Sequence, residues 1–101
     1  MENTKQRKPL VPYKTLKQTQ KARIANWMYR ETLRYYLEHS CTPTGDALER
    51  LAETIFAKAQ CYHISFDEVR ELFLHRQEKY EPRIQKDIEN GMTLKSLQKP
   101  V

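Results

Sequence analysis

The sequence contains little glycine, little proline and no long apolar run. Its two glycines, Gly45 and Gly91, do not form a glycine-rich loop of the kind that binds nucleotide phosphates. With only five prolines in a chain rich in Lys, Glu, Gln and Leu, the composition favours a few long helices. A chain of 101 residues is long enough for one domain with a modest core.

Segments that direct a protein to or across a membrane are also missing. No apolar run approaches the roughly 20 residues that a membrane span requires. Residues 1–5 lack the apolar segment of a secretory signal. We therefore expect a cytoplasmic protein without a membrane partner, in which Cys41 and Cys61 remain reduced thiols.

The sequence also lacks known catalytic motifs. The sequence has no Gly-x-Ser-x-Gly, no His-Glu-x-x-His and no paired carboxylates beyond those that soluble helix surfaces explain. We therefore expect a protein that is not an enzyme and that uses no cofactor.

Two mirrored pairs, His39 with Cys41 and Cys61 with His63, have the residue types of a zinc site. The helix predicted between them separates the pairs by about 25 Å, because a helix rises about 1.5 Å per residue. Zinc ligands lie about 2 Å from one ion, so we expect no metal site.

What the sequence does contain is an uneven distribution of charge. Residues 1–34 carry nine Lys or Arg and two Glu, a net charge of +7. Residues 35–101 carry nine basic and eleven acidic residues, a net charge of −2. Such asymmetry indicates either a surface that meets a polyanion or a solvated helix with a basic tail.

The residue patterns predict an all-α fold, a small bundle of three main helices plus a short fourth helix, with a flexible basic N-terminal arm. Thr42 or Thr44 is the expected cap of the second helix. Pro82 either begins the fourth helix or kinks one continuous helix. The predicted segments are a flexible arm over 1–13, one helical domain over 14–91 with helices over 14–38, 44–60, 66–80 and 83–89, and a frayed tail over 92–101.

The clearest local signal is the start of the third helix. Ser65 is typical of an N-cap, and Glu68, three residues later, is placed to reach back to free backbone N–H groups. Ile64 and Val69 occupy the two positions of a hydrophobic staple. A helix is therefore predicted to begin directly after Ser65.

The corner before this helix resembles a helix-turn-helix motif. The residues at the small, turn and packing positions of that motif are Ala59, His63, Ile64, Ser65, Val69 and Leu72. The sequence departs from the motif because a histidine stands where glycine is preferred and because the would-be recognition helix opens with Phe66-Asp67-Glu68. Carboxylates there repel a DNA backbone, so the basic N-terminal third is the better candidate surface.

The leading functional hypothesis is a non-enzymatic accessory or regulatory protein that contacts nucleic acid. Arg23, Arg30 and Arg34 form a basic stripe on the first helix with Trp27 at its edge, an arrangement suited to phosphates and bases. The alternative for this stripe is that the arginines pair with acidic residues of neighbouring helices and Trp27 belongs to the core. The residues predicted to bind nucleic acid are Lys5, Arg7, Lys8, Lys14, Lys17, Lys21, Arg23, Arg30 and Arg34.

The second hypothesis is a protein-interaction module, with a homodimer as one form of it. It uses the aromatic residues of the first helix as an exposed apolar patch for a partner helix. These residues are Trp27, Tyr29, Tyr35 and Tyr36.

Overall fold

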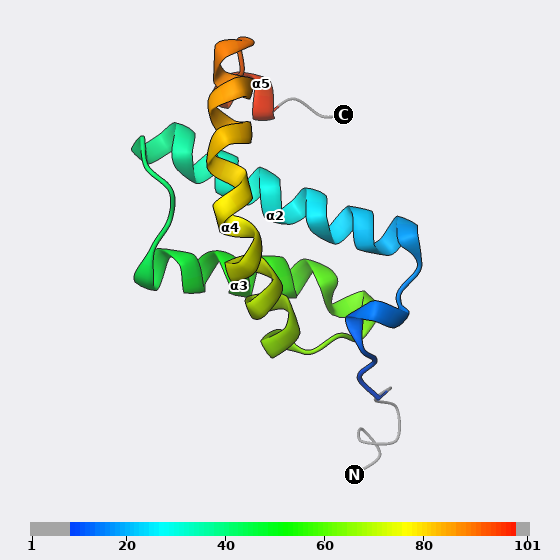
Figure 1. Cartoon of the computed structure of the whole chain (residues 1–101). Coiled ribbons are helices and arrows are strands. Elements are labelled where there is room, and N and C mark those ends of the chain that lie inside the picture. The colour runs from blue at the N-terminus through cyan, green and yellow to red at the C-terminus, as the bar shows by residue number, and fades with distance from the viewer. Residues whose placement is uncertain (1–8, 99–101) are drawn as a thin grey trace.

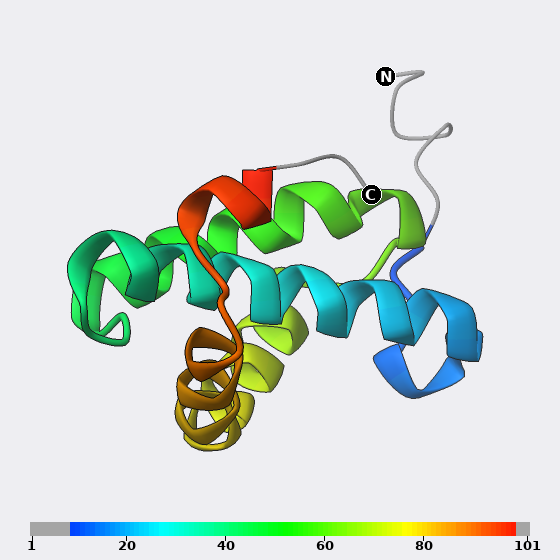
Figure 2. The ribbon, with the colours of Figure 1, turned by 90° about the horizontal axis from the view of Figure 1, so that it is seen from above.

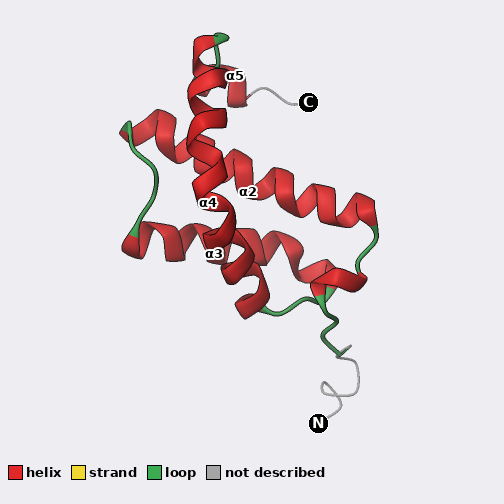
Figure 3. Ribbon diagram, in the orientation of Figure 1, coloured by secondary structure: helices red, strands yellow, loops and turns green. Residues whose placement is uncertain are grey.

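The computed structural model describes residues 9–98, which form helices joined by short connections (Figure 1). No strand occurs within this range (Figure 3). The predicted all-α class is confirmed, with three long helices and one short α-helix in the described part of the chain. Including two 3-10 helices, labelled η, the order is η1 (Tyr13–Thr15), α2 (Gln18–His39), α3 (Gly45–Ala59), η2 (Gln60–Tyr62), α4 (Phe66–Glu89) and α5 (Leu94–Gln98).

The two helices α2 and α3 run side by side in opposite directions, and α4 crosses both of them (Figure 1). Seen from above, α4 points almost along the line of sight while α2 and α3 lie across it (Figure 2). One core fills the space between the elements. Its buried apolar side chains are Ile24, Met28, Tyr29, Leu33, Ala52, Ile55, Ala59, Ile64, Val69, Phe73, Tyr80, Ile84 and Leu97.

The first long helix begins later than the predicted residue 14. Tyr13–Thr15 form a 3-10 turn, and Lys17 has an extended backbone before α2 starts at Gln18. The Gln20 side chain accepts a hydrogen bond from the Lys17 N–H at 3.1 Å, which satisfies one free donor at the helix start.

The start of α4 confirms the predicted N-cap and corrects the role of Glu68. The Ser65 hydroxyl accepts from the Glu68 N–H at 3.1 Å, and Ile64 and Val69 are both buried. The Glu68 carboxylate does not close a capping box. It accepts instead from the Tyr13 N–H, at 3.0 and 3.2 Å.

Pro82 lies inside one continuous helix, since α4 runs from Phe66 to Glu89. The predicted short helix over 83–89 is therefore the last part of α4. Pro82 is exposed, so the carbonyl that loses its helical N–H partner can be hydrated instead. Gly91, with φ of 99° in the left-handed region that favours glycine, follows the helix end.

The short fourth helix is α5, which forms where a frayed tail was predicted. The Thr93 hydroxyl accepts from the Ser96 N–H at 3.2 Å at its start. Leu97 is only 3% exposed and joins the core. The tail prediction is therefore wrong for residues 94–98, because one well-placed leucine and a cap hold this turn against α2.

The end of the predicted flexible arm is held by hydrogen bonds. Val11 N–H donates to the His63 carbonyl at 2.8 Å, and Tyr13 N–H binds Glu68. Residues 1–8, which include Lys5, Arg7 and Lys8, lie outside the described residues. The arm prediction is thus corrected for Val11 and Tyr13.

Candidate nucleic-acid interface

The predicted phosphate-binding residues do not form one continuous surface. Lys14, Lys17, Arg23 and Arg34 are exposed, whereas Lys21 and Arg30 are half-buried. The guanidinium of Arg30 donates to the Leu97 carbonyl at 2.8 Å, at the end of α5. The stripe predicted on α2 is therefore interrupted at its middle residue, which has a structural partner.

The expected alternative, in which the arginines of α2 pair with neighbouring acids, is not seen among residues 9–98. The ion pairs within this range are Arg70 with Glu49, at 2.7 Å, and His39 with Glu38, at 3.9 Å. The hydrogen bond from Arg70 lowers the pKa of Glu49 and raises the pKa of Arg70. This partnered arginine belongs to α4.

The predicted aromatic patch is divided among several environments. Trp27 is half-buried and stacks on Tyr62, with ring centroids 6.1 Å apart. Tyr35 is half-buried beside His39, and Tyr36 accepts a 2.6 Å hydrogen bond from the Gln85 side chain. The prediction of exposed aromatics fails at Tyr29, which is 4% exposed because it packs between α2 and α4.

A basic groove lies between the first half of α2 and the middle of α4, the helices that cross in Figure 1. It consists of two adjoining hollows of about 410 and 270 Å³ that share Ala22, Ala25 and Arg76. No Asp or Glu lines either of these two hollows. We call this site the basic groove, and its lining residues are Tyr13, Gln18, Lys21, Ala22, Ala25, Asn26, Arg76, Tyr80 and Arg83.

The groove separates the basic residues of α2 into two sets. Lys21 lines the groove, and Arg23, two residues later, lies about 200° further round the helix. Arg34 lies within about 20° of Arg23, since eleven residues make about three turns. Arg23 and Arg34 therefore form an outer surface of α2 on the far side from the groove.

The basic residues of α4 were not among the phosphate-binding residues predicted from the sequence. Arg76, Lys79, Arg83 and Lys86 are spaced by three, four and three residues, which places them on one helix face. Arg76 and Arg83 line the groove. The spacing was a readable signal, but the net charge of −2 over residues 35–101 concealed it.

Tyr80 lies within the groove wall and is 4% exposed. Its hydroxyl is inaccessible to solvent and has no hydrogen-bond partner among the described residues. Burial raises the pKa of Tyr80, and the nearby Arg76 and Arg83 side chains oppose this rise. Of the two cations, Arg76 has the larger effect on the pKa of Tyr80.

The neighbouring Tyr29 is fully partnered. Its hydroxyl donates to an oxygen of Asp87, and the Arg83 guanidinium lies 3.7 Å from the centre of its ring. Burial raises the pKa of Tyr29 above its ordinary range, and Asp87 raises it further. The Asp87 carboxylate is thus already engaged by Tyr29 beside the groove.

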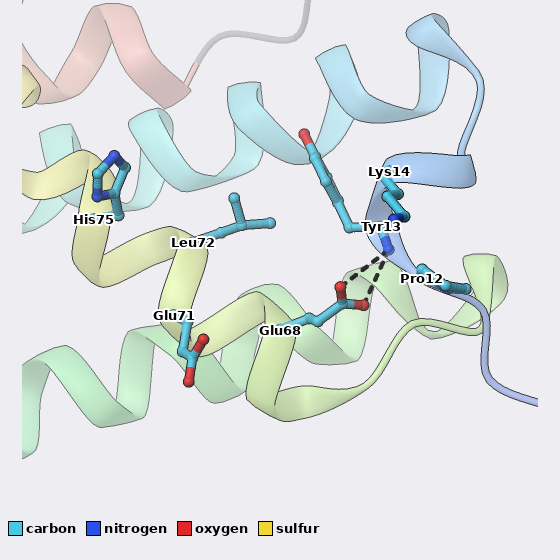
Figure 4. Close-up of a pocket in the computed structure, with 7 residues that line it drawn as sticks. All are labelled: Pro12, Tyr13, Lys14, Glu68, Glu71, Leu72 and His75. Atoms are coloured by element: carbon cyan, nitrogen blue, oxygen red, sulfur yellow. Dashed lines mark hydrogen bonds between the residues drawn. The ribbon is translucent and has the colours of Figure 1, made fainter.

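A second depression, of about 590 Å³, lies beside the end of the groove and shares Tyr13 with it (Figure 4). Figure 4 shows the two hydrogen bonds by which the Glu68 carboxylate holds the Tyr13 N–H. Lys14 and the Glu68 carboxylate, which accepts from the Tyr13 N–H, both line this depression beside the groove. Its lining residues are Pro12, Tyr13, Lys14, Glu68, Glu71, Leu72 and His75.

At the corner that resembles a helix-turn-helix, the turn residue has a left-handed backbone. His63 adopts φ of 63°, in the left-handed region that favours glycine. The Glu68 carboxylate at the start of α4 is occupied by Tyr13. In the first turn of α4, the Glu68 carboxylate therefore makes a structural contact.

The two His/Cys pairs flank α3, which runs from Gly45 to Ala59. Within residues 9–98, no group of three or more His, Cys, Asp or Glu side chains is arranged to hold a metal ion. None of the helices in this range has the combined length and apolar character needed to cross a membrane.

Comparisons of the chain with protein-family models, with curated proteins and with solved structures found no significant match.

Proposed function

We propose that this protein is a non-enzymatic accessory or regulatory protein that contacts nucleic acid through electrostatics. The observation that supports the proposal best is the basic groove, where Lys21 of α2 meets Arg76 and Arg83 of α4 in hollows without a lining carboxylate. Two helices far apart in the sequence thus contribute cations to one concave surface.

A phosphate backbone is the polyanion that fits such a surface. Lys and Arg contacts to phosphates provide affinity without sequence information, and they release counterions from the nucleic acid. Lys14 and Lys17 extend the positive charge toward the chain start, and the sequence adds Lys5, Arg7 and Lys8 before them. Binding of this kind is independent of sequence and weakens steeply with salt.

The predicted phosphate-binding residues support this proposal to different degrees. Lys21 gains support because it lines the groove, and Arg76 and Arg83 join it. Arg30 loses support because its guanidinium binds the Leu97 carbonyl. Arg23 and Arg34 remain exposed cations on the outer surface of α2.

The proposal is tested by fluorescence anisotropy with labelled single- and double-stranded DNA at several salt concentrations. Wild-type protein should bind with micromolar or tighter affinity at low salt, and log K should fall linearly with log salt concentration. The double variant Arg76→Glu/Arg83→Glu should bind at least tenfold more weakly, with a salt slope smaller by about two.

Arg23→Glu/Arg34→Glu is the matched control, since it makes the same change in net charge on the outer surface of α2. It should weaken binding less than the groove variant does. Equal losses in both variants would contradict a specific role for the groove, and no DNA binding by wild-type protein at low salt would overturn the proposed function. A dimeric mass by light scattering in that case would favour the protein-interaction alternative.

A further inference from the structure

We propose that the ring of Tyr13 is a stacking platform for one base of a single-stranded nucleic acid whose phosphates lie in the basic groove. The inference deepens the proposed function and rests on it, since it names the class of nucleic acid that the groove takes. Tyr13 is the residue shared by two surfaces of different character, the hollow of about 410 Å³ in the groove and the depression of Figure 4.

The backbone of Tyr13 is anchored, and its ring is accessible. The Tyr13 N–H donates to both oxygens of the Glu68 carboxylate, at 3.0 and 3.2 Å, and the nearby Val11 N–H donates to the His63 carbonyl at 2.8 Å. Figure 4 shows the Tyr13 side chain extending from this segment, with Leu72 of α4 pointing toward it. The side chain is half-buried, so part of the ring is open to solvent. A platform that is already in place loses little conformational freedom on binding.

The groove beside Tyr13 is cationic. The Lys21 ammonium lies 5.6 Å from the centre of the Tyr13 ring, and Lys21 lines the same hollow as Arg76. No Asp or Glu lines this hollow, and α2 contributes the small side chains of Ala22 and Ala25 to it. The ammonium keeps its donors for a phosphate, because a cation–π contact close to the limit of about 6 Å is weak. A phosphate next to the ring is therefore met by cations from two helices.

The depression beside Tyr13 is larger and more apolar, with a volume of about 590 Å³. This volume lies within the range of about 300–1,000 Å³ that is usual for small-molecule sites. Leu72 and Pro12 contribute apolar surface, and the carboxylates of Glu68 and Glu71 line it as well. These carboxylates repel a phosphate, whereas a flat base packs against the tyrosine ring and the leucine side chain. The exposed Glu71 carboxylate can also accept a hydrogen bond from an amino group of a base.

The two surfaces together favour a nucleotide whose base is free. A simple anion uses only the groove, and a neutral apolar ligand uses only the depression. The bases of a duplex are stacked on their neighbours and must be unstacked before they can reach a protein side chain. A single strand presents its bases without this cost, and proteins bind such strands through a positively charged groove with aromatic rings for the bases. The arrangement at Tyr13 has both parts.

Tyr13→Leu is the decisive variant, because it removes the ring but keeps an apolar side chain and the backbone N–H that binds Glu68. Fluorescence anisotropy measures its affinity for a single-stranded DNA oligonucleotide of mixed sequence and for the duplex that this strand forms with its complement. Wild-type protein should bind the single strand more tightly than the duplex. Tyr13→Leu should bind the single strand about tenfold more weakly, with an unchanged salt slope because no cation is lost, and its duplex affinity should change little.

Tyr13→Phe is the matched control, since it keeps the ring and loses only the hydroxyl. It should bind the single strand as wild-type protein does, and a loss as large as that of Tyr13→Leu would overturn stacking on the ring. Methyl NMR of wild-type protein gives a readout that does not depend on how a variant folds. A base stacked beside Leu72 should shift its methyl signals, while those of the buried Leu33 stay in place. Unchanged Leu72 signals at saturation with the single strand would also overturn the inference.

The outcomes distinguish this inference from the proposed function. If wild-type protein binds DNA and Tyr13→Leu binds the single strand equally well, the stacking platform is refuted and the proposed function stands. The same conclusion follows if wild-type protein binds the duplex more tightly than the single strand. If wild-type protein binds neither DNA at low salt, both are overturned.

Discussion

Tyr29 and Tyr80 pack edge to face, with ring centroids 5.4 Å apart, but their hydroxyl groups differ. The Tyr29 hydroxyl donates to Asp87, whereas the Tyr80 hydroxyl has no partner within residues 9–98. Both side chains are apolar enough to enter the core, so each adds buried area between α2 and α4. At the scale of single residues, the same amino acid therefore contributes a stabilising hydrogen bond at one position and only buried area at the other.

Tyr29→Phe should destabilise the protein by about 1.5 kcal/mol at pH 8, because a hydrogen bond to a charged carboxylate is lost. The loss should depend on pH. The pKa of Tyr29 is raised in the folded protein, so its stabilising contribution is present below the ordinary tyrosine pKa of about 10 and is lost as pH rises above it. Urea unfolding at pH 8 and at about pH 11 should show a smaller difference between variant and wild type at the higher pH.

Tyr80 is present in both proteins, so its own titration cancels in this comparison. A difference in the free energy of unfolding that stays constant with pH would contradict the assigned pKa shift of Tyr29.

At the scale of elements, the long helices begin with different local chemistry. The Ser65 hydroxyl caps α4 by accepting from the Glu68 N–H. Thr44 occupies the N-cap position of α3, but its side chain makes no capping hydrogen bond, contrary to the expectation that Thr42 or Thr44 caps this helix. Pro43 just before it is buried, so packing helps to fix the start of α3.

Ser65→Ala should therefore destabilise the protein by about 1 kcal/mol, the usual cost of losing an N-cap. Thr44→Ala is the matched substitution at a cap position without the hydrogen bond, and its effect should be within about 0.5 kcal/mol. Urea unfolding of both variants measures the difference, and equal effects would show that the Ser65 hydrogen bond contributes little.

At the scale of the whole molecule, α4 holds the start of the described chain. The Glu68 carboxylate binds the Tyr13 N–H, and the adjacent His63 carbonyl accepts from the Val11 N–H. Tyr13 lines both the basic groove and the depression beside it. The position of the segment around Tyr13 therefore determines the shape of the groove at this end and where Lys14 lies.

Glu68→Ala should release residues 11–15 from α4. Loss of a hydrogen bond to a charged group, about 1.5 kcal/mol, corresponds to roughly tenfold faster hydrogen exchange of the Tyr13 amide. Glu71→Ala is the control, because Glu71 lines the same depression without such a bond to Tyr13. Hydrogen exchange measured by NMR or mass spectrometry checks this, and unchanged exchange in Glu68→Ala would exclude the carboxylate as the anchor.

The sequence predicted the helices better than the contacts between them. The Ser65 cap is visible in the sequence because it depends on residues within a few positions. The cap at Thr93 was equally local, but the weak apolar content around Leu97 hid it. The site was only partly predictable: Lys21 was named for its charge, while Arg76 and Arg83 were not linked to it because nothing local joins α4 to α2.

The sequence by itself determined that the chain is all-α and where most helices end. These features follow from hydrogen bonds and side-chain periodicity within single helices. Only the tertiary structure decided that Tyr29 is buried, that Arg30 binds the end of α5 and that Lys21 meets Arg76 and Arg83 in one groove. The physical reason is that the crossing of α2 and α4 depends on how side chains from distant parts of the chain pack together, and no local pattern specifies that packing.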